Sequence, residues 1–362
     1  MSQVRIARSL LSLVLPMLFI GCGGGSGSTP VTPPPPTSAR LAFVANSASN
    51  SISIYAVDRT TGQLTPKNTV PTVGTDPRVL TLDPSGHFLY SGNVTSNDIS
   101  VFSVDATTGN LTMIGSPVPA GNSPRFIAIG PTGNILYSVN QQGGVTGFSI
   151  NSSTGALTEL SGIVPTDDAP VELTFHPSGN FAYVVNFNSG DLTAYRVDNS
   201  GALALLGAVP VDLSLTSVGF HPSGKFAYVT SLASNQITTF DVSQVSGGLT
   251  PISPSVSTGD GPTSTTIDAR GRFAYVTNAI SSTISVFSID QGNGVLTPVS
   301  TVPAETNPIA LTLDATGGFA YVANAGSDNI STFKVDPTTG LLTALGQPLN
   351  SGSGPTSVVL TK

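Results

Sequence analysis

Two arginines and one glutamate stand at matching or adjacent places in three consecutive segments of the chain. Arg78 and Arg125 each follow a proline directly, and Glu172 follows Pro170 by two positions. Charged residues make up only 9% of the 362 residues, so this recurrence is notable. A guanidinium stabilises the oxyanion that develops on an ester carbonyl, and a carboxylate takes a proton from water. The three residues are therefore candidates for ester hydrolysis.

A second interpretation gives the same residues only a structural role. Arg78 and Arg125 would brace loops, and Glu172 would be their salt-bridge partner. Neither a paired histidine nor a second acid is evident beside them in the sequence, which favours this structural interpretation. Both interpretations stay open on the sequence alone.

The histidines indicate turns rather than metal binding. His176 and His221 each begin an HPSG phrase, at a place that holds Asp83, Asp268 or Asp314 in other segments. A place shared by Asp and His is typical of a hydrogen-bonded turn. With three histidines and one cysteine in the chain, we predict no transition-metal site and no cofactor. Binding of Ca²⁺ by scattered Asp carboxylates stays open on the sequence alone. No nucleophile elbow, phosphate loop or zinc-protease motif is present.

An internal repeat determines the expected fold. An aromatic residue followed by small or apolar residues, and in most copies by Asn, recurs as FVAN, YSGN, YSVN, YVVN, YVTS, YVTN and YVAN. The aromatic residues lie 45 to 47 residues apart, at Phe43, Tyr90, Tyr137, Tyr183, Tyr228, Tyr275 and Tyr321. Each unit contains four short apolar segments separated by turns. A period near 46 with four strands per unit is typical of a β-propeller blade.

The unit from Pro77 shows the pattern. Its expected strands are residues 79–83, 87–93, 99–105 and 111–118, separated by turns rich in Gly, Asn and Asp. In the turn before the fourth strand, we expect an Asp to accept hydrogen bonds and a Gly to adopt a left-handed conformation. This Asp recurs as Asp58, Asp105, Asp198, Asp290 and Asp336.

The two ends of the repeat region complement each other. Residues 355–362 match the first strand of a repeat unit, but no second strand follows them. The segment from Leu41 matches a second strand, but no first strand precedes it. We therefore predict an all-β protein, a single seven-bladed β-propeller with four antiparallel strands per blade. Its C-terminal strand joins the three N-terminal strands and closes the ring.

The propeller places the candidate chemistry at one mouth of the central channel. The two positions after the proline of each unit should line this mouth. The first of them holds Arg78, Arg125, Val171, Thr216, Thr263, Ile309 and Thr356. The second holds one charged residue, Glu172, and otherwise Val79, Phe126, Ser217, Ser264, Ala310 and Ser357. We therefore expect Arg78, Arg125 and Glu172 to converge on one side of the mouth.

The repeated phrases resemble those of YVTN-type propellers and of lactonase-like seven-bladed propellers, the group that includes bacterial 6-phosphogluconolactonase. GTDPRVLTLDPSGHFLYSGN (74–93) and HPSGNFAYVVN (176–186) carry the resemblance, which covers about residues 40–362. The resemblance implies the propeller fold and an activity on lactones.

The chain departs from the pattern that this resemblance implies for enzymes of the family. Those enzymes tend to have a histidine after Pro-Arg, where this chain has Val79 and Phe126. They also tend to have a glutamate after the YVxN phrase, where it has Phe187. These departures weaken the implied activity and favour binding without catalysis.

Residues 1–21 are typical of a bacterial lipoprotein signal peptide. Arg5 and Arg8 precede an apolar stretch, Leu10 to Ile20, that is too short to span a bilayer comfortably. Cys22, the only cysteine, follows a small residue at the end of this stretch and resembles the acylated cysteine of a lipobox. An incidental cysteine in an ordinary signal is the alternative, but this position favours lipidation.

Residues 22–39 are rich in Gly, Ser and Pro and predict a tether between the acylated cysteine and a propeller of residues 40–362. Gly23 favours the outer membrane over the inner. The net charge of −7 becomes more negative when a signal containing Arg5 and Arg8 is removed. This acidity argues against nucleic acid, so the only expected membrane contact is the lipid anchor.

Two functions remain after this reasoning. The first is an envelope-anchored, non-catalytic binding or scaffold module that holds a small molecule, a glycan or a protein at the channel mouth. The alternative is an extracytoplasmic lactone hydrolase, a carboxylic ester hydrolase, that uses Arg78, Arg125 and Glu172. A panel of lactones and the effect of replacing Arg125 would distinguish them.

Overall fold

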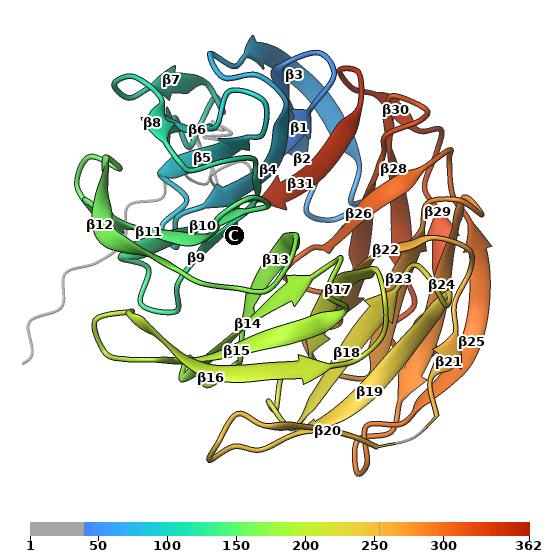
Figure 1. Ribbon diagram of the computed structural model, residues 1–362. Helices are drawn as coiled ribbons and strands as arrows, with labels where there is room; N and C mark the ends of the chain where they lie inside the picture. The colour runs from blue at the N-terminus through green and yellow to red at the C-terminus, as the bar shows by residue number, and fades with distance from the viewer. Residues whose placement is uncertain (1–39, 253) are drawn as a thin grey trace, which may run out of the picture. The chain divides into compact units, whose positions relative to one another are not determined.

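Every regular element of residues 40–252 and 254–362, the part described by the computed structural model, is a β-strand. These residues contain no helix that could span a membrane. The strands form seven antiparallel sheets around a central axis, and Figure 1 views them close to this axis. The fold prediction is confirmed. The predicted signal peptide, Cys22 and the predicted tether lie outside the described residues.

Each sheet is one blade. In six blades the strands follow one another outward from the axis in chain order, and in the first blade β31 lies innermost, before β1, β2 and β3. The innermost strands are β4 (Pro77–Leu82), β9 (Pro124–Ile129), β13 (Pro170–Phe175), β17 (Leu215–Phe220), β22 (Pro262–Ile267), β26 (Pro308–Leu313) and β31 (Pro355–Leu360). The second strands carry the aromatic repeat: β1 (Arg40–Asn46), β5 (Phe88–Asn93), β10 (Ile135–Asn140), β14 (Phe181–Asn186), β18 (Phe226–Ser231), β23 (Phe273–Asn278) and β27 (Phe319–Asn324).

The third strands follow by short hairpins: β2 (Ser51–Val57), β6 (Asp98–Val104), β11 (Gly144–Ile150), β15 (Asp191–Val197), β19 (Gln236–Val242), β24 (Thr283–Ile289) and β28 (Asn329–Val335). Four blades end in a continuous outer strand: β3 (Leu64–Pro71), β12 (Leu157–Val164), β16 (Leu203–Pro210) and β25 (Leu296–Pro303). In the other three the outer strand consists of two short pieces: β7 (Leu111–Met113) and β8 (Val118–Pro119), β20 (Leu249–Pro251) and β21 (Val256–Ser257), β29 (Leu342–Ala344) and β30 (Leu349–Asn350).

The split outer strand corrects one expectation. The sequence predicted a continuous strand over residues 111–118, but the structure pairs only its two ends with β6. Gly115 between them has a φ of 66°, a left-handed conformation that breaks a ladder. Pro117 also lacks the N–H that a ladder needs.

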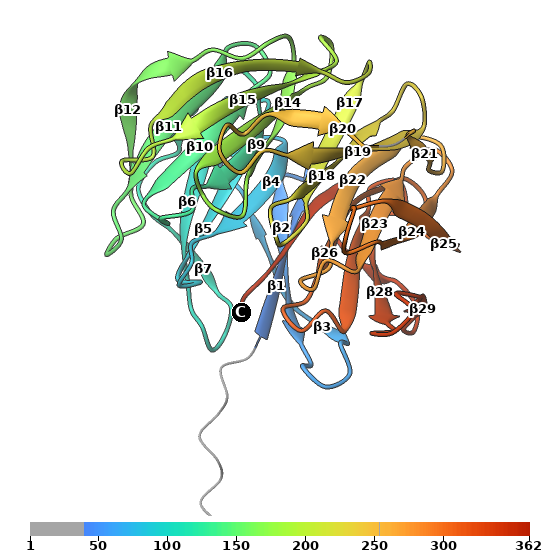
Figure 2. The same ribbon diagram turned by 90° about the horizontal axis from the view of Figure 1, so that it is seen from below.

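The ring closes between the ends of the described chain, as predicted. Strand β31 pairs with β1 from Ala42↔Leu360 to Asn46↔Pro355, which completes a four-stranded sheet with β2 and β3. The Thr361 N–H adds a hydrogen bond to the carbonyl oxygen of Leu41 at 2.9 Å. Figure 2 shows the start of β1 and the C-terminus side by side at one face of the propeller.

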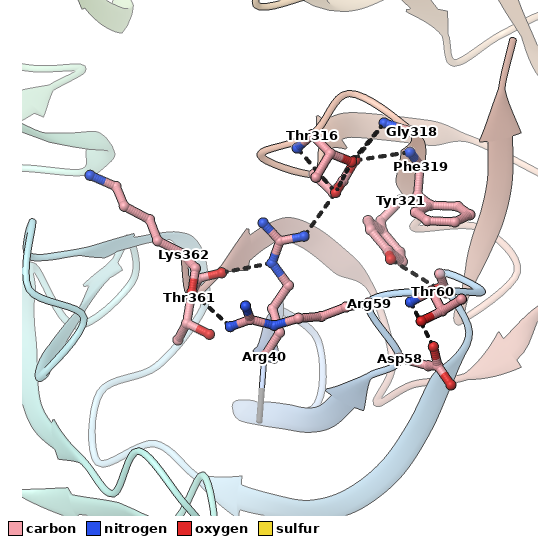
Figure 3. A network of polar contacts seen from close by, with 12 residues as sticks. Arg40, Asp58, Arg59, Thr60, Thr316, Gly318, Phe319, Tyr321, Thr361 and Lys362 are labelled. Carbon is pink, nitrogen blue, oxygen red and sulfur yellow. Dashed lines mark hydrogen bonds and ion pairs between the residues drawn. The ribbon is translucent and has the colours of Figure 1, made fainter. Parts of the chain in front are cut away.

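A buried ion pair reinforces this closure and links the first blade to the last. Figure 3 shows Arg40 between Thr361 beyond β31 and the turn of the last blade that contains Thr316. Arg40 Nη1 lies 2.8 Å from Asp314 Oδ2, and its Nε donates to the Thr361 carbonyl oxygen at 3.0 Å. Burial alone would raise the pKa of Asp314. Hydrogen bonds from Thr316, from the Phe319 backbone and from Arg40 outweigh burial and hold this pKa below its usual range.

The hydrophobic core is a ring of clusters between adjacent blades rather than one central core. The cluster between the second and third blades, for example, joins Tyr90 and Val101 to Leu136 and Phe148. Another joins Tyr55 of the first blade to Tyr321 of the last, across the closure. Because each blade buries both faces against its neighbours, an open ring would expose two apolar faces to water.

The repeated tyrosines fasten each blade to the next. Five tyrosine hydroxyls donate to the carbonyl oxygen of a glycine in the outer turn of the following blade, and the hydroxyl of Tyr321 in the last blade donates in the same way to Gly62 in the first at 2.9 Å. These six glycines have φ between 72° and 84°, a left-handed conformation that glycine adopts without strain. The seventh place holds Phe43, which has no hydroxyl.

We predict that removing residues 355–362 lowers the free energy of unfolding by at least about 4 kcal/mol. The truncation removes a complete ladder, the buried Val358 and the partner of the Arg40 Nε. Denaturant unfolding of the purified propeller measures the loss. Deletion of Lys362 alone is the matched control and should change stability by less than about 1 kcal/mol. Equal stability of the two truncations would contradict the prediction.

Candidate functional site

The inner strand of each blade carries a β-bulge at the same place, one residue after its first residue. In β4, for example, Pro77 pairs with Asn93 and Val79 with Gly92, so Arg78 has no partner in the ladder. The same shift recurs in all seven blades, and the unpaired residues are Arg78, Arg125, Val171, Thr216, Thr263, Ile309 and Thr356. A bulge redirects a side chain away from the regular alternation of a strand.

A left-handed residue precedes every one of these strands. Two of the seven are glycines, Gly261 and Gly354, and the other five have φ between 54° and 60°: Asp76, Ser123, Ala169, Ser214 and Asn307. Non-glycine residues in this conformation carry backbone strain. Side chains of the preceding blade hold four of these seven turns, for example through Asn50 Oδ1, which accepts from the Asp76 N–H at 2.7 Å.

All seven bulge residues line one cavity of about 340 Å³ on the axis of the propeller. Most of the next residues along each strand also line it, among them Glu172, Phe126 and Ser264. The structure therefore brings Arg78, Arg125 and Glu172 to a single cavity, from the second, third and fourth blades. Their chemical roles remain predictions.

Glu172 is enclosed by protein but keeps part of its surface open to the cavity. Burial raises the pKa of Glu172 to about 7, although hydrogen bonds from Thr174, from Ser217 and from the Val218 backbone oppose the shift. Thr174 Oγ1 donates to Glu172 Oε1 at 2.8 Å. A carboxyl group with this pKa gains and loses a proton near neutral pH, which suits a general base.

Arg125 has no ion-pair or hydrogen-bond partner within residues 40–252 and 254–362, and it is partly buried against the cavity. Burial and the nearby charge of Arg78 lower the pKa of its guanidinium, which Asp76 partly offsets. An arginine remains charged in proteins even so. An unpaired, partly buried guanidinium favours an anion or an oxygen with developing negative charge.

Arg78, unlike Arg125, forms an ion pair. Its Nε lies 3.1 Å from Asp76 Oδ1, and 38% of its side-chain surface is exposed. In the described part of the chain no ion pair joins Glu172 to Arg78 or to Arg125. The structural interpretation expected Glu172 to be the salt-bridge partner of the arginines, and this was wrong: Asp76 pairs with Arg78 instead.

The histidines serve in turns. The Ser178 N–H donates to His176 Nδ1 at 3.1 Å, and the other ring nitrogen lies 2.8 Å from the Gly224 carbonyl oxygen. His221 makes the same turn with Ser223. Over residues 40–252 and 254–362 no three His, Cys, Asp or Glu side chains lie close enough to hold a metal ion.

Two cavity residues were missed as lining residues by the sequence reasoning. Phe187 and Leu232 line the cavity from the loops after β14 and β18. Each follows directly the last residue of a second strand, Asn186 or Ser231. The loops differ between blades, so the only sequence signal for these two cavity residues is that each directly follows the repeated aromatic motif.

A second cavity, of about 720 Å³, lies at the other mouth of the channel. The far ends of inner strands line it, including Leu82, Leu313 and Leu360, together with Arg40. Its buried guanidinium, that of Arg40, is already neutralised by Asp314. The smaller cavity is the better candidate site because it contains an unpaired cation and a carboxyl group that titrates near neutral pH.

The sequence profile of the family described as "Lactonase, 7-bladed beta-propeller" matches residues 37–123, 116–212 and 217–360. No curated protein sequence matches the chain significantly.

Solved structures share the fold over nearly all of the chain. One is a Bacteroides fragilis protein for which 6-phosphogluconolactonase activity has been suggested, with 21% identity, a TM-score of 0.78, and coverage of 91% of this chain and 100% of that one. Another is the periplasmic gluconolactonase of Pseudomonas aeruginosa, with 20% identity, a TM-score of 0.75, and coverage of 90% and 99%. At such identities the likeness shows the fold alone.

We predict that Glu172→Gln stabilises the protein at pH 8 and not at pH 4. The folded-state pKa of about 7 lies above the usual value of 4.5, so wild-type stability falls as pH rises from about 4.5 through 7. Removing the ionisable group should raise the free energy of unfolding by up to about 3 kcal/mol at pH 8. Denaturant unfolding at both pH values measures the difference, and parallel pH profiles for the two proteins would contradict the prediction.

Proposed function

The chain belongs to the lactonase family of seven-bladed β-propellers, and from this premise we propose that it hydrolyses a lactone in the cavity lined by the bulge residues. The observation that carries the proposal is that one cavity contains both a candidate general base and a candidate oxyanion donor. Glu172 titrates near neutral pH, and Arg125 offers a guanidinium with no partner in the described part of the chain. General-base catalysis and oxyanion stabilisation need these two groups.

The proposed reaction has two steps. Ionised Glu172 takes a proton from a water molecule while the water oxygen bonds to the lactone carbonyl carbon, and Arg125 stabilises the resulting oxyanion. The tetrahedral intermediate then collapses, the bond between the carbonyl carbon and the ring oxygen breaks, and Glu172 returns its proton to the leaving alkoxide. The product is the open hydroxy acid, whose carboxylate can remain near the arginines until it dissociates.

Binding without catalysis is the second candidate function. The histidine implied by the family resemblance after Pro-Arg is replaced by Val79 and Phe126, and both line the cavity. A site that lacks this histidine can still hold a ligand through Arg78 and Arg125. The two candidates therefore differ in turnover rather than in the location of the site.

We predict that Arg125→Ala lowers kcat/KM for a hydrolysed lactone by about 10²- to 10³-fold, because an oxyanion donor is lost. The wild-type rate should rise with the ionisation of Glu172, with an apparent pKa near 7, and Glu172→Gln should remove this dependence. Product acid released from a lactone panel measures the rates. Arg270→Ala is the matched control, because Arg270 is exposed and lies outside the cavity.

One result would contradict hydrolysis: the absence of turnover on every lactone of the panel by a protein whose circular dichroism shows intact sheet structure. This result would leave binding without catalysis as the function of the cavity. Equal activity of Arg125→Ala and Arg270→Ala would instead contradict the role of Arg125 as the oxyanion donor.

We further propose that the protein is exported and held at the bacterial cell envelope, most favourably the outer membrane, by a lipid on Cys22. The support is the sequence of residues 1–39 alone.

We predict that wild-type cells incorporate labelled palmitate into this protein and that Cys22→Ser abolishes the labelling. A lipid anchor needs the thiol of this cysteine, because it is the only one in the chain. Fractionation should move the Cys22→Ser protein from the membrane to the soluble fraction. Ser26→Ala, in the tether, is the control and should keep the label. Labelling of the Cys22→Ser protein would contradict the proposal.

A further inference from the structure

The candidate cavity has a charged side and an apolar side. Arg78 and Arg125 come from the second and third blades, and Glu172 comes from the fourth. On the fourth and fifth blades, which include Glu172, the lining also contains the apolar residues Val171, Phe187 and Leu232. We call these last three residues the apolar side. A ligand that reaches the arginines and Glu172 can therefore lie against Phe187 and Leu232 as well.

Most hydroxyls of the cavity are already bonded within the protein. Thr216 Oγ1 lies 3.0 Å from Thr230 Oγ1. Thr263 Oγ1 lies 2.9 Å from Thr277 Oγ1 and donates to the Pro308 carbonyl oxygen at 3.0 Å. These hydroxyls would have to break such bonds before they could donate to a ligand.

The remaining hydroxyls offer little more. Thr356 Oγ1 donates to the Pro77 carbonyl oxygen at 3.4 Å, and Ser357 Oγ accepts from the Leu80 N–H at 3.2 Å. Ser264 is the one cavity hydroxyl with no partner within residues 40–252 and 254–362. A ligand with several hydroxyl groups would lose its water shell here and find few replacements away from the charged residues.

We infer that the substrate is a lactone whose ring carries an alkyl or aryl substituent rather than several hydroxyl groups. This inference rests on the proposed function. The lactone carbonyl lies toward Arg125, the attacking water lies beside Glu172, and the substituent packs on Phe187 and Leu232. The cavity should prefer apolar substituents because each methylene moved from water to an apolar surface favours binding, whereas each hydroxyl left without a hydrogen bond opposes it.

The test compares three lactones with the same six-membered ring: unsubstituted δ-valerolactone, δ-decalactone with its pentyl chain, and glucono-δ-lactone with its hydroxyl groups. We expect kcat/KM to be at least about tenfold higher for δ-decalactone than for δ-valerolactone. Glucono-δ-lactone should fall below both. The full mature protein is used throughout.

Variants connect this preference to the apolar side. Phe187→Ser and, separately, Leu232→Ser should reduce the preference for δ-decalactone over δ-valerolactone by about three- to tenfold, because each removes a surface on which the pentyl chain packs. Leu341→Ser is the matched control, since Leu341 is 41% exposed and lies outside the cavity. Two independent variants keep the test valid if one of them folds poorly.

Binding of lactams separates the failure of this inference from the failure of the proposed hydrolysis. The lactam analogues of δ-decalactone and glucono-δ-lactone keep the ring and its substituents but resist hydrolysis, and calorimetry measures their affinities. If lactones are hydrolysed but glucono-δ-lactone is preferred, the inference is overturned and the proposed function stands. If no lactone is hydrolysed, tighter binding of the pentyl lactam still supports the apolar specificity, and equal or weaker binding overturns it.

Discussion

The pairing of β31 with β1 is the constraint on which the rest of the structure depends. A blade buries apolar residues on both faces, so each of the seven interfaces between blades needs an intact blade on either side. A ring satisfies this need only when it has no ends. The closing ladder, the buried pair of Arg40 with Asp314, and the bond from Tyr321 to Gly62 complete the last of these interfaces.

The candidate site arises from variation at one repeated backbone position. The left-handed residue, the strand start and the bulge recur in every blade, so the fold presents seven side chains to the axis whatever their type. Most of these places hold Thr or an apolar residue, and only Arg78 and Arg125 carry charge at the bulge itself. Neighbouring blades thus combine two guanidinium groups and one carboxyl group without any change in the scaffold.

The sequence predicted the fold almost completely, because period, turn residues and apolar alternation are local signals repeated seven times. It also placed Arg78, Arg125 and Glu172 at one mouth. It could not predict the pKa of Glu172, which depends on burial by several blades together, or that Asp76 rather than Glu172 pairs with Arg78.

The sequence did not identify Phe187 and Leu232 as cavity residues, because the geometry of their loops determines where these side chains lie. The split of residues 111–118 follows from the φ of Gly115, which local composition did not reveal.

The closing ladder joins segments about three hundred positions apart in the chain, and this determines the order in which the protein can assemble. Strands β1, β2 and β3 are synthesised first, yet their sheet lacks its innermost strand until residues 355–360 arrive. During translation this first blade therefore has an unpaired edge. Closure of the ring is thus a late event, because the first blade is completed only by the last strand of the propeller.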